Sequence, residues 1–250
     1  MTFGDHLEVL RRMLCRIIAV VAALMIVIFC FKDVTFSLLL APSKSDFITY
    51  QWLAALCGKV GIDFNLEDYC VQLIATDLSS QFMTHVTASC NLALLIASPY
   101  IVFELFRFIS PALYENERKY SVRVVLSVYL LFIVGVLMTY FVLFPISFRF
   151  LGTYQVAAEV TNNITIDSYI GTLSTLTLLM GVVFQLPVLT YFLAKMGIID
   201  SDLLCKYRRH ALVLIMIVAA IITPPDLMTL AIVTIPMYLL YELSILIIKH

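Results

Sequence analysis

The sequence predicts an all-α membrane protein with six transmembrane helices and both termini in the cytoplasm. Of its 250 residues, 62% are hydrophobic and 13% are charged, whereas soluble domains are about 45–50% apolar and about 25% charged. The charges are confined to short stretches between long uncharged runs. Lipid offers backbone groups no hydrogen-bond partners, so runs of this kind are expected to cross a membrane as helices.

Six apolar runs define the expected spans. They cover about residues 15–38, 78–104, 122–144, 168–194, 209–224 and 227–248. The fifth run has only 16 residues between Arg209 and Asp226. These rise about 24 Å, against a hydrocarbon thickness of about 30 Å. The fifth and sixth helices are therefore expected to be short.

Two segments outside the spans are also expected to be structured. Residues 1–14 predict an amphipathic segment on the membrane surface, because leucines recur there at helical spacing. Residues 41–77 predict an external cap that includes a helix over 46–60. A connection of this length inside a compact domain needs structure of its own.

The cations predict the orientation. With six spans the loops alternate between two faces, and twelve of the 16 Lys and Arg residues fall on the face that carries both termini. Cytoplasmic loops carry an excess of these residues, so this face is expected inside. The alternative for Arg11, Arg12 and Arg16 is that they serve only as this topology signal. The net charge of −1 gives no surplus that would indicate a nucleic-acid partner.

The sequence predicts no enzyme activity, no cofactor and no metal ion. It has no P-loop, GxSxG or HExxH motif, and its six cysteines form no CxxC or Cys/His cluster. Cys57 and Cys70 share the outer segment, so a disulfide between them is compatible with the sequence, as is the reduced pair. The alternative class is a polytopic solute transporter, which would need an internal repeat and a polar midplane site. No repeat is visible, and the spans offer only His85, Asn91 and Gln185 centrally.

The most charged connection between two spans is residues 98–123. It holds four cations and three carboxylates, namely Arg107, Arg118, Lys119, Arg123, Glu104, Glu115 and Glu117. We expect it to form part of a cytoplasmic recognition surface for a basic peptide.

Eight short motifs occur in an order that resembles one known family. They are His6–Arg12 (HLEVLRR), Ala41–Pro42, Ile74–Asp77 with Phe82, Phe108–Tyr114 (FISPALY) followed by Glu117–Arg118, Phe141–Pro145 (FVLFP), Phe184–Val188 (FQLPV), Thr223–Asp226 (TPPD) and Ile235–Met237. Together they span nearly the whole chain. The chain resembles the TatC family, the core membrane subunits of the twin-arginine protein translocase.

The resemblance implies a six-helix fold shaped like a cupped hand, in a bacterial inner membrane or an organellar one. It implies that the N-terminal segment and the first cytoplasmic loop recognise the twin-arginine signal peptides of folded precursor proteins. It also implies single-span partner subunits of the TatA and TatB type, a homo-oligomer within a larger complex, and export driven by the proton-motive force.

Two positions depart from the family pattern. The glutamate of the family's HLxELR motif falls at Val9, and a carboxylate stands one place earlier at Glu8. One residue turns a helix by about 100°, so Glu8 need not face the same way. The glutamate of the family's FEVPV motif is Gln185, which forms hydrogen bonds but carries neither charge nor proton.

The chemistry of the expected site follows from its target. Each guanidinium group pairs best with a carboxylate through two parallel hydrogen bonds. Glu117 is the main candidate, because it sits in the cytoplasmic loop before the helix resumes. The residues expected to contact the signal peptide are Glu117, Glu8, Arg11, Glu104, Phe108, Pro111, Leu113 and Arg118.

The two main carboxylates each have a structural alternative. Glu117 can pair with Arg118 on a solvated face, where such a pair contributes about 0–1 kcal/mol. Glu104 and Arg107 are three residues apart, so they can pair across one helix turn instead of contacting the peptide.

Other polar and proline residues have expected roles within the spans and turns. Gln185 and Glu242 are expected to be intramembrane polar or partner contacts, with interhelical hydrogen bonding as the alternative. Asp226 is expected to cap the sixth helix. The residues expected to form structural turns are Pro42, Pro187, Pro225 and Asp226.

Overall fold

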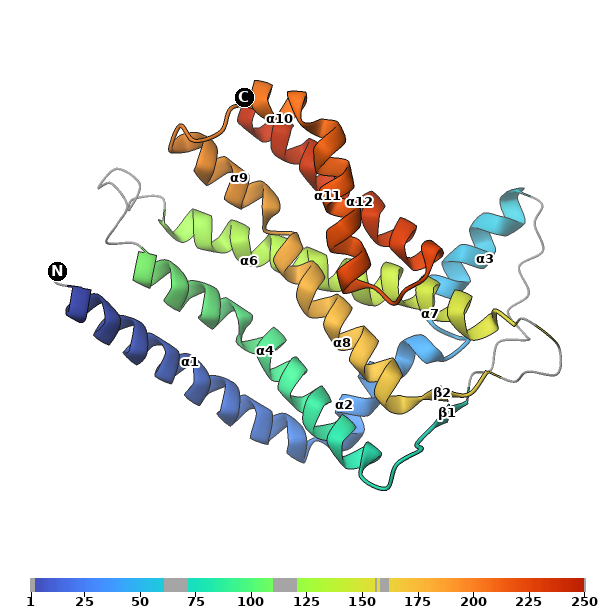
Figure 1. Cartoon of the computed structure of the whole chain (residues 1–250). Helices are drawn as coiled ribbons and strands as arrows, with labels where there is room; N and C mark the ends of the chain where they lie inside the picture. The colour runs from blue at the N-terminus through green and yellow to red at the C-terminus, as the bar shows by residue number, and fades with distance from the viewer. Residues whose placement is uncertain (1–2, 61–71, 110–120, 156, 158–161, 250) are drawn as a thin grey trace.

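The computed structural model describes residues 3–60, 72–109, 121–155, 157 and 162–249. Almost all of this part of the chain is helical (Figure 1). The helices are α1 (Phe3–Cys30), α2 (Lys32–Leu39), the 3-10 turn η1 (Ala41–Ser43), α3 (Ile48–Val60), α4 (Ser80–Ile109), α6 (Ser121–Met138), the π-helical turn η3 (Thr139–Leu143), α7 (Phe144–Thr153), α8 (Ile166–Val183), α9 (Leu186–Lys195), α10 (Ser201–Lys206), α11 (Arg208–Ile222) and α12 (Leu227–Lys249).

The predicted all-α membrane fold is confirmed. Among the described residues, five segments are long and apolar enough to cross a membrane, namely Leu7–Cys30, Ser80–Leu105, Val125–Thr153, Ile166–Lys195 and Leu227–Lys249. The fifth span in chain order, α11, is short as expected, with 15 residues and a length of about 22 Å. The expectation of a short sixth span is wrong. Helix α12 continues past Glu242 to Lys249, so its 23 residues reach about 35 Å.

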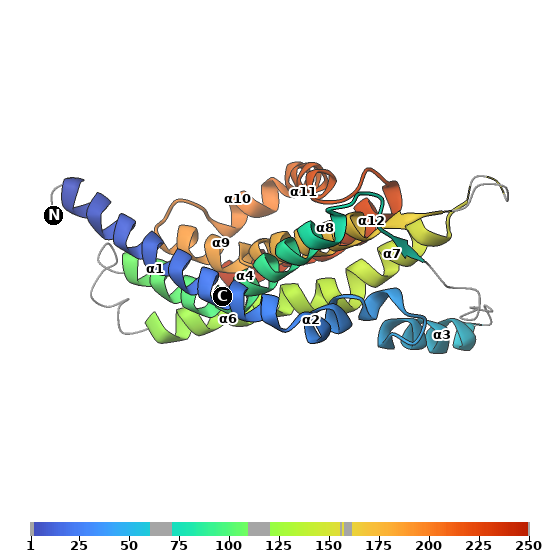
Figure 2. The same cartoon turned by 90° about the horizontal axis from the view of Figure 1, so that it is seen from below.

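The spans run up and down between two ends of the molecule. The N-terminus, the end of α4 and the start of α6 lie at one end, and α2, α3 and α7 lie at the other (Figure 1). The view from below places the N-terminus and α3 at opposite ends of an elongated molecule (Figure 2). The chain therefore brings α1, α4 and α6 together at the end that carries its charged loop.

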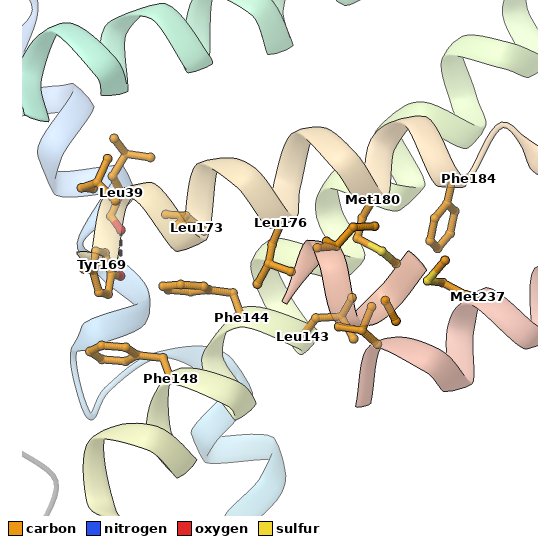
Figure 3. Packing of buried hydrophobic residues seen from close by; sticks show 14 of the residues in the cluster. Leu39, Leu143, Phe144, Phe148, Tyr169, Leu173, Leu176, Met180, Phe184 and Met237 are labelled. Carbon is orange, nitrogen blue, oxygen red and sulfur yellow. Dashed lines mark hydrogen bonds between the residues drawn. The ribbon is translucent and has the colours of Figure 1, made fainter. Parts of the chain in front are cut away.

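Helix α8 is the centre of the hydrophobic core (Figure 3). Leu176 and Met180 are fully buried along it. Near its start, the Tyr169 ring packs edge-on against Phe144 and Phe148 of α7, with centroid distances of 5.0 and 4.8 Å. The Tyr169 hydroxyl donates to the backbone oxygen of Leu39 at 2.9 Å. One tyrosine thus joins the core to the end of α2.

Two more tyrosines fasten the segment from α2 to α3. The Tyr50 hydroxyl lies 2.8 Å from the carbonyl oxygen of Pro42 and 3.1 Å from that of Pro145. The Tyr140 hydroxyl donates to the carbonyl oxygen of Leu38 at 2.6 Å. The carbonyls of Leu38 and Pro42 lie near the C-terminal ends of α2 and η1, where backbone oxygens lack intrahelical partners. Pro42 is buried within η1, so it forms the turn that the sequence predicts, and α3 is the helix expected over 46–60.

A small parallel ladder was not predicted from the sequence. Strand β1 (Leu73–Ile74) pairs with β2 (Ile164–Thr165), so Leu73 lies opposite Ile164. The ladder joins two connections that are distant in the sequence. Strands of two residues are too short to produce the alternating pattern from which a strand is predicted.

The fourth apolar run is broken into α8 and α9. Pro187 is buried in the first turn of α9, has no N–H group, and its ring would clash with the carbonyl of residue 183 in a continuous helix. The break places Gln185 at the junction. Pro99 and Pro236 lie inside α4 and α12 without ending either helix.

The turn between α11 and α12 is closed by Asp226. Its Oδ1 accepts the backbone N–H of Thr229 at 2.7 Å, which is the expected helix cap. Its own N–H donates to the Pro224 carbonyl at 2.7 Å, and Pro225 stands exposed between them.

Replacing Asp226 with alanine should lower the free energy of unfolding by about 1 kcal/mol, since α12 loses its cap. Asp226→Asn should stay close to the wild type, because asparagine caps as well. Thermal unfolding of the detergent-purified protein measures both. Equal stability of the alanine and asparagine variants would contradict the capping role.

Helices α6 and α8 approach closely at two glycines. A Cβ on Gly135 would lie 2.9 Å from the backbone oxygen of Met180, and one on Gly181 would lie 2.6 Å from the Phe132 ring. Small residues at such crossings let membrane helices pack closely.

Gly135→Ala should therefore destabilise the protein by about 1–3 kcal/mol, because it overpacks this contact. Gly171 of α8 is the matched control, since an added Cβ there meets nothing within 4 Å. The amount of folded protein that survives heating, read by size-exclusion chromatography, compares the two. A Gly135→Ala protein as heat-resistant as Gly171→Ala would rule out a tight α6–α8 contact.

Candidate functional site

A cleft of about 760 Å³ lies between the start of α1 and the end of α4. These two helices pack along their length. The start of α1 and the end of α4 lie at the end of the molecule that carries the N-terminus (Figure 1). The lining of the cleft consists of Val9, Arg11, Arg12, Met13, Cys15, Arg16, Glu104, Arg107 and Phe108.

Glu104 is the buried charge of this cleft, with 3% of its surface exposed. Its Oε2 lies 3.0 Å from Nη2 of Arg16, and its Oε1 lies 3.8 Å from Nη1 of Arg107. The pair with Arg107 is the one that sequence spacing predicts. The closer pair with Arg16 was missed, because no local pattern connects a residue in α1 with one in α4.

The ion pair with Arg16 is not a hydrogen bond. Among the described residues, Oε2 of Glu104 has no hydrogen-bond partner although a guanidinium nitrogen lies 3.0 Å away. Distance sets the Coulomb attraction, whereas a hydrogen bond also needs the N–H group to point at the oxygen. The charge of Glu104 is therefore compensated by the nearby Arg16 guanidinium, while its Oε2 has no hydrogen-bond donor among the described residues.

Glu8 and Val9 face different surroundings. The Glu8 carboxylate pairs with Arg12 one turn further along α1, and both side chains are exposed. Glu8 is absent from the cleft lining, whereas Val9 is part of it. The one-place offset seen in the sequence thus turns the Glu8 carboxylate away from the cleft.

The other residues that are expected to contact the signal peptide fall either on the lining of the cleft or within residues 110–120. Arg11 and Phe108 line the cleft. The others, which fall within residues 110–120 and lie outside the described part of the chain, are Pro111, Leu113, Glu117 and Arg118.

Gln185 lies at the edge of a second, almost wholly apolar groove of about 530 Å³. The groove is walled by α4, α6, α8 and α9, and Ser98 is its other polar side chain. Nε2 of Gln185 donates to the Gly181 carbonyl at 3.2 Å. Its Oε1 is buried and has no partner among the described residues.

Glu242 has partners within the chain. It accepts a hydrogen bond from Arg208 at 2.8 Å and another from the Tyr238 hydroxyl at 2.9 Å. Arg208 begins α11, so this contact joins the short fifth span to α12.

The cysteines and possible metal ligands add no second site within the described residues. Cys15, Cys30, Cys90 and Cys205 are free, and no group of three His, Cys, Asp or Glu side chains is placed to hold a metal ion. Cys70 lies outside the described part, and nothing is described of the Cys57 side chain.

The fold and the cleft define a class of protein before any comparison is made. It is a polytopic helical membrane protein with a charged, solvent-open recess where α1 and α4 meet at one end of the bundle. The profile of one family, Sec-independent protein translocase protein (TatC), matches residues 5–236. The chain belongs to the TatC family.

Relatives and solved structures agree over the full length. The TatC protein of Blattabacterium from Periplaneta americana is 34% identical over 98% of this chain and 94% of its own length. That of Desulforapulum autotrophicum is 31% identical over 97% of this chain and 82% of its own. A crystal structure described as the twin-arginine translocase receptor TatC superposes with a TM-score of 0.79 at 30% identity, covering 98% of this chain and all of the other.

Family membership settles the broad class. The chain is a multi-pass membrane protein and a component of twin-arginine protein transport rather than an enzyme. The alternative of a solute transporter is excluded, because the match to TatC proteins extends along the whole chain.

The Arg16–Glu104 pair should matter for stability. Arg16→Ala leaves a buried carboxylate with only the more distant Arg107, and an unpaired buried charge is costly. We expect a loss of about 1–3 kcal/mol, since Arg16 itself is half exposed. Arg12→Ala is the matched control, because it breaks an exposed pair on the same helix and should change stability by less than about 1 kcal/mol.

Thermal unfolding in detergent measures both variants. Equal losses for Arg16→Ala and Arg12→Ala would show that the pair between α1 and α4 adds no stability beyond that of a surface pair.

Proposed function

We propose that this chain is the receptor subunit that recognises the twin-arginine signal peptide of folded precursor proteins at its cytoplasmic face. The observation that carries the proposal is the recess between α1 and α4 at the end of the bundle that holds the N-terminus. The adjoining connection, residues 98–123, holds four cations and three carboxylates. A solved relative with the same fold is described as a twin-arginine translocase receptor.

The cation distribution supports the cytoplasmic assignment. Arg11, Arg12, Arg16 and Arg107 gather at this end, and an excess of such residues is typical of the cytoplasmic side. The external cap at 41–77 then faces the other side of the membrane.

In this proposal the guanidinium groups of the peptide are bound by carboxylates, although arginines outnumber carboxylates on the described lining of the recess. Among the described residues, four guanidinium groups line the recess against one carboxylate, so a peptide with two arginines needs further acceptors. Glu117 supplies the main one, because a carboxylate accepts a guanidinium group through two parallel hydrogen bonds. In the same proposal Phe108 and Pro111 set the shape of the loop and offer the peptide an apolar surface, and Leu113 is a further contact.

The same proposal includes partner subunits. The apolar groove beside Gln185 has the composition of a surface that accepts a transmembrane helix, because it is apolar with two polar groups. Single-span subunits of the TatA and TatB type, assembled with further copies of this chain, would use such surfaces during export driven by the proton-motive force.

The test is photo-crosslinking of a twin-arginine precursor to membranes that contain the full-length protein. Glu117→Arg should reduce the crosslink at least about tenfold, since it replaces attraction with repulsion at one contact. Glu117→Ala should have a smaller effect in the same direction. Asp202→Asn is the control, because it removes an exposed carboxylate of α10 outside the recess.

A precursor with two lysines should crosslink poorly to the wild type. Undiminished crosslinking of Glu117→Arg would overturn the role of Glu117. Failure of the wild type to export a twin-arginine reporter, in a strain lacking its own TatC, would overturn the proposed function.

A further inference from the structure

Glu104 has the features of a binding carboxylate that is not fully occupied. It is the one carboxylate on the cleft lining among the described residues, and it is 3% exposed. A buried carboxylate normally accepts hydrogen bonds that replace those it had with water. Oε2 of Glu104 has none from the described residues. The cleft therefore contains an acceptor that a guanidinium donor from outside would satisfy.

The two arginines beside Glu104 hold it unequally. Arg16 lies 3.0 Å away and belongs to α1, so it bridges two helices. Arg107 lies 3.8 Å away on the same helix as Glu104, and 63% of its side chain is exposed. The Arg107 guanidinium is thus largely in water already, and at this distance it forms no hydrogen bond with the buried carboxylate. Arg107 can therefore leave Glu104 for water at little cost, whereas Arg16 remains.

We propose that Glu104 accepts one guanidinium group of the twin-arginine segment, and that Arg107 occupies this position while the cleft is empty. This inference rests on the proposed function and adds a second recognition residue to it. The incoming guanidinium forms two parallel hydrogen bonds with the carboxylate, which Arg107 at 3.8 Å does not. The guanidinium of the peptide takes the place of the Arg107 guanidinium, so a cation compensates the charge of the buried carboxylate both before and after binding.

The position of Val9 provides a variant that separates the effect of Glu104 on peptide binding from its effect on the contact between α1 and α4. Val9 and Glu104 line the same cleft from α1 and α4 respectively. A carboxylate placed at position 9 would enter this cleft, whereas Glu8 is not part of its lining and pairs with Arg12 along α1. A negative charge removed from α4 can therefore be returned from α1 without restoring the contact between the two helices.

The experiment measures binding of a synthetic twin-arginine signal peptide, and of its twin-lysine counterpart, to the full chain in phospholipid nanodiscs. Glu104→Gln, which keeps shape but removes charge, should weaken twin-arginine binding about tenfold and reduce the preference over twin-lysine. Arg107→Gln should tighten binding about three- to tenfold, because the competitor is gone. Asp202→Asn should match the wild type.

The combined variant Val9→Glu with Glu104→Gln should recover most of the lost affinity. A purely structural role for Glu104 would leave this double variant as weak as Glu104→Gln. Thermal unfolding, recorded on every variant, excludes the explanation that weak binding reflects loss of fold.

These measurements distinguish failure of the proposed receptor function from failure of the role assigned to Glu104. If the wild type does not prefer the twin-arginine peptide, the proposed function fails and this inference fails with it. If the wild type has the preference and Glu104→Gln keeps it, only this inference is overturned. Weaker binding by Arg107→Gln would also overturn it, since Arg107 would then assist the ligand rather than compete with it.

Discussion

The constraint on which this structure depends is that lipid provides no hydrogen bonds to the backbone. Each interruption of a span must therefore find its partners inside the protein. Tyr140, Tyr169 and Tyr50 donate to carbonyls at the turns around α2 and η1, and Asp226 caps α12. These side chains allow the chain to change direction several times and still bury a continuous core around α8.

The same constraint explains where polar side chains lie within the bundle. At the break before α9, the side chain of Gln185 lies close to the end of α8, and its amide donates to Gly181. Its Oε1 is buried without a partner among the described residues, and the residue lines a groove that is otherwise nearly all apolar. Arg208 and Glu242 likewise satisfy one another where the short α11 meets α12. These two polar sites thus lie at the break between α8 and α9 and at the start of α11.

Charge at the end that carries the N-terminus has a different arrangement. The ion pair of Arg16 with Glu104 joins α1 to α4 beside an open cleft. It neutralises a buried carboxylate without satisfying its hydrogen-bonding capacity. This pair joins two spans, and it contains the carboxylate to which we assign a part in the proposed recognition.

The sequence alone determined the fold class, the family and the short fifth span, because long uncharged runs and ordered motifs are local properties of the chain. It also predicted the Asp226 cap and the turn at Pro42, which depend on neighbouring residues. Only the tertiary structure decided the Arg16–Glu104 pair, the tyrosine contacts and the β1–β2 ladder, since each joins residues far apart in sequence. It also showed that α12 is not a short helix. It placed Val9, rather than Glu8, in the cleft, because the direction of a side chain depends on how its helix is packed.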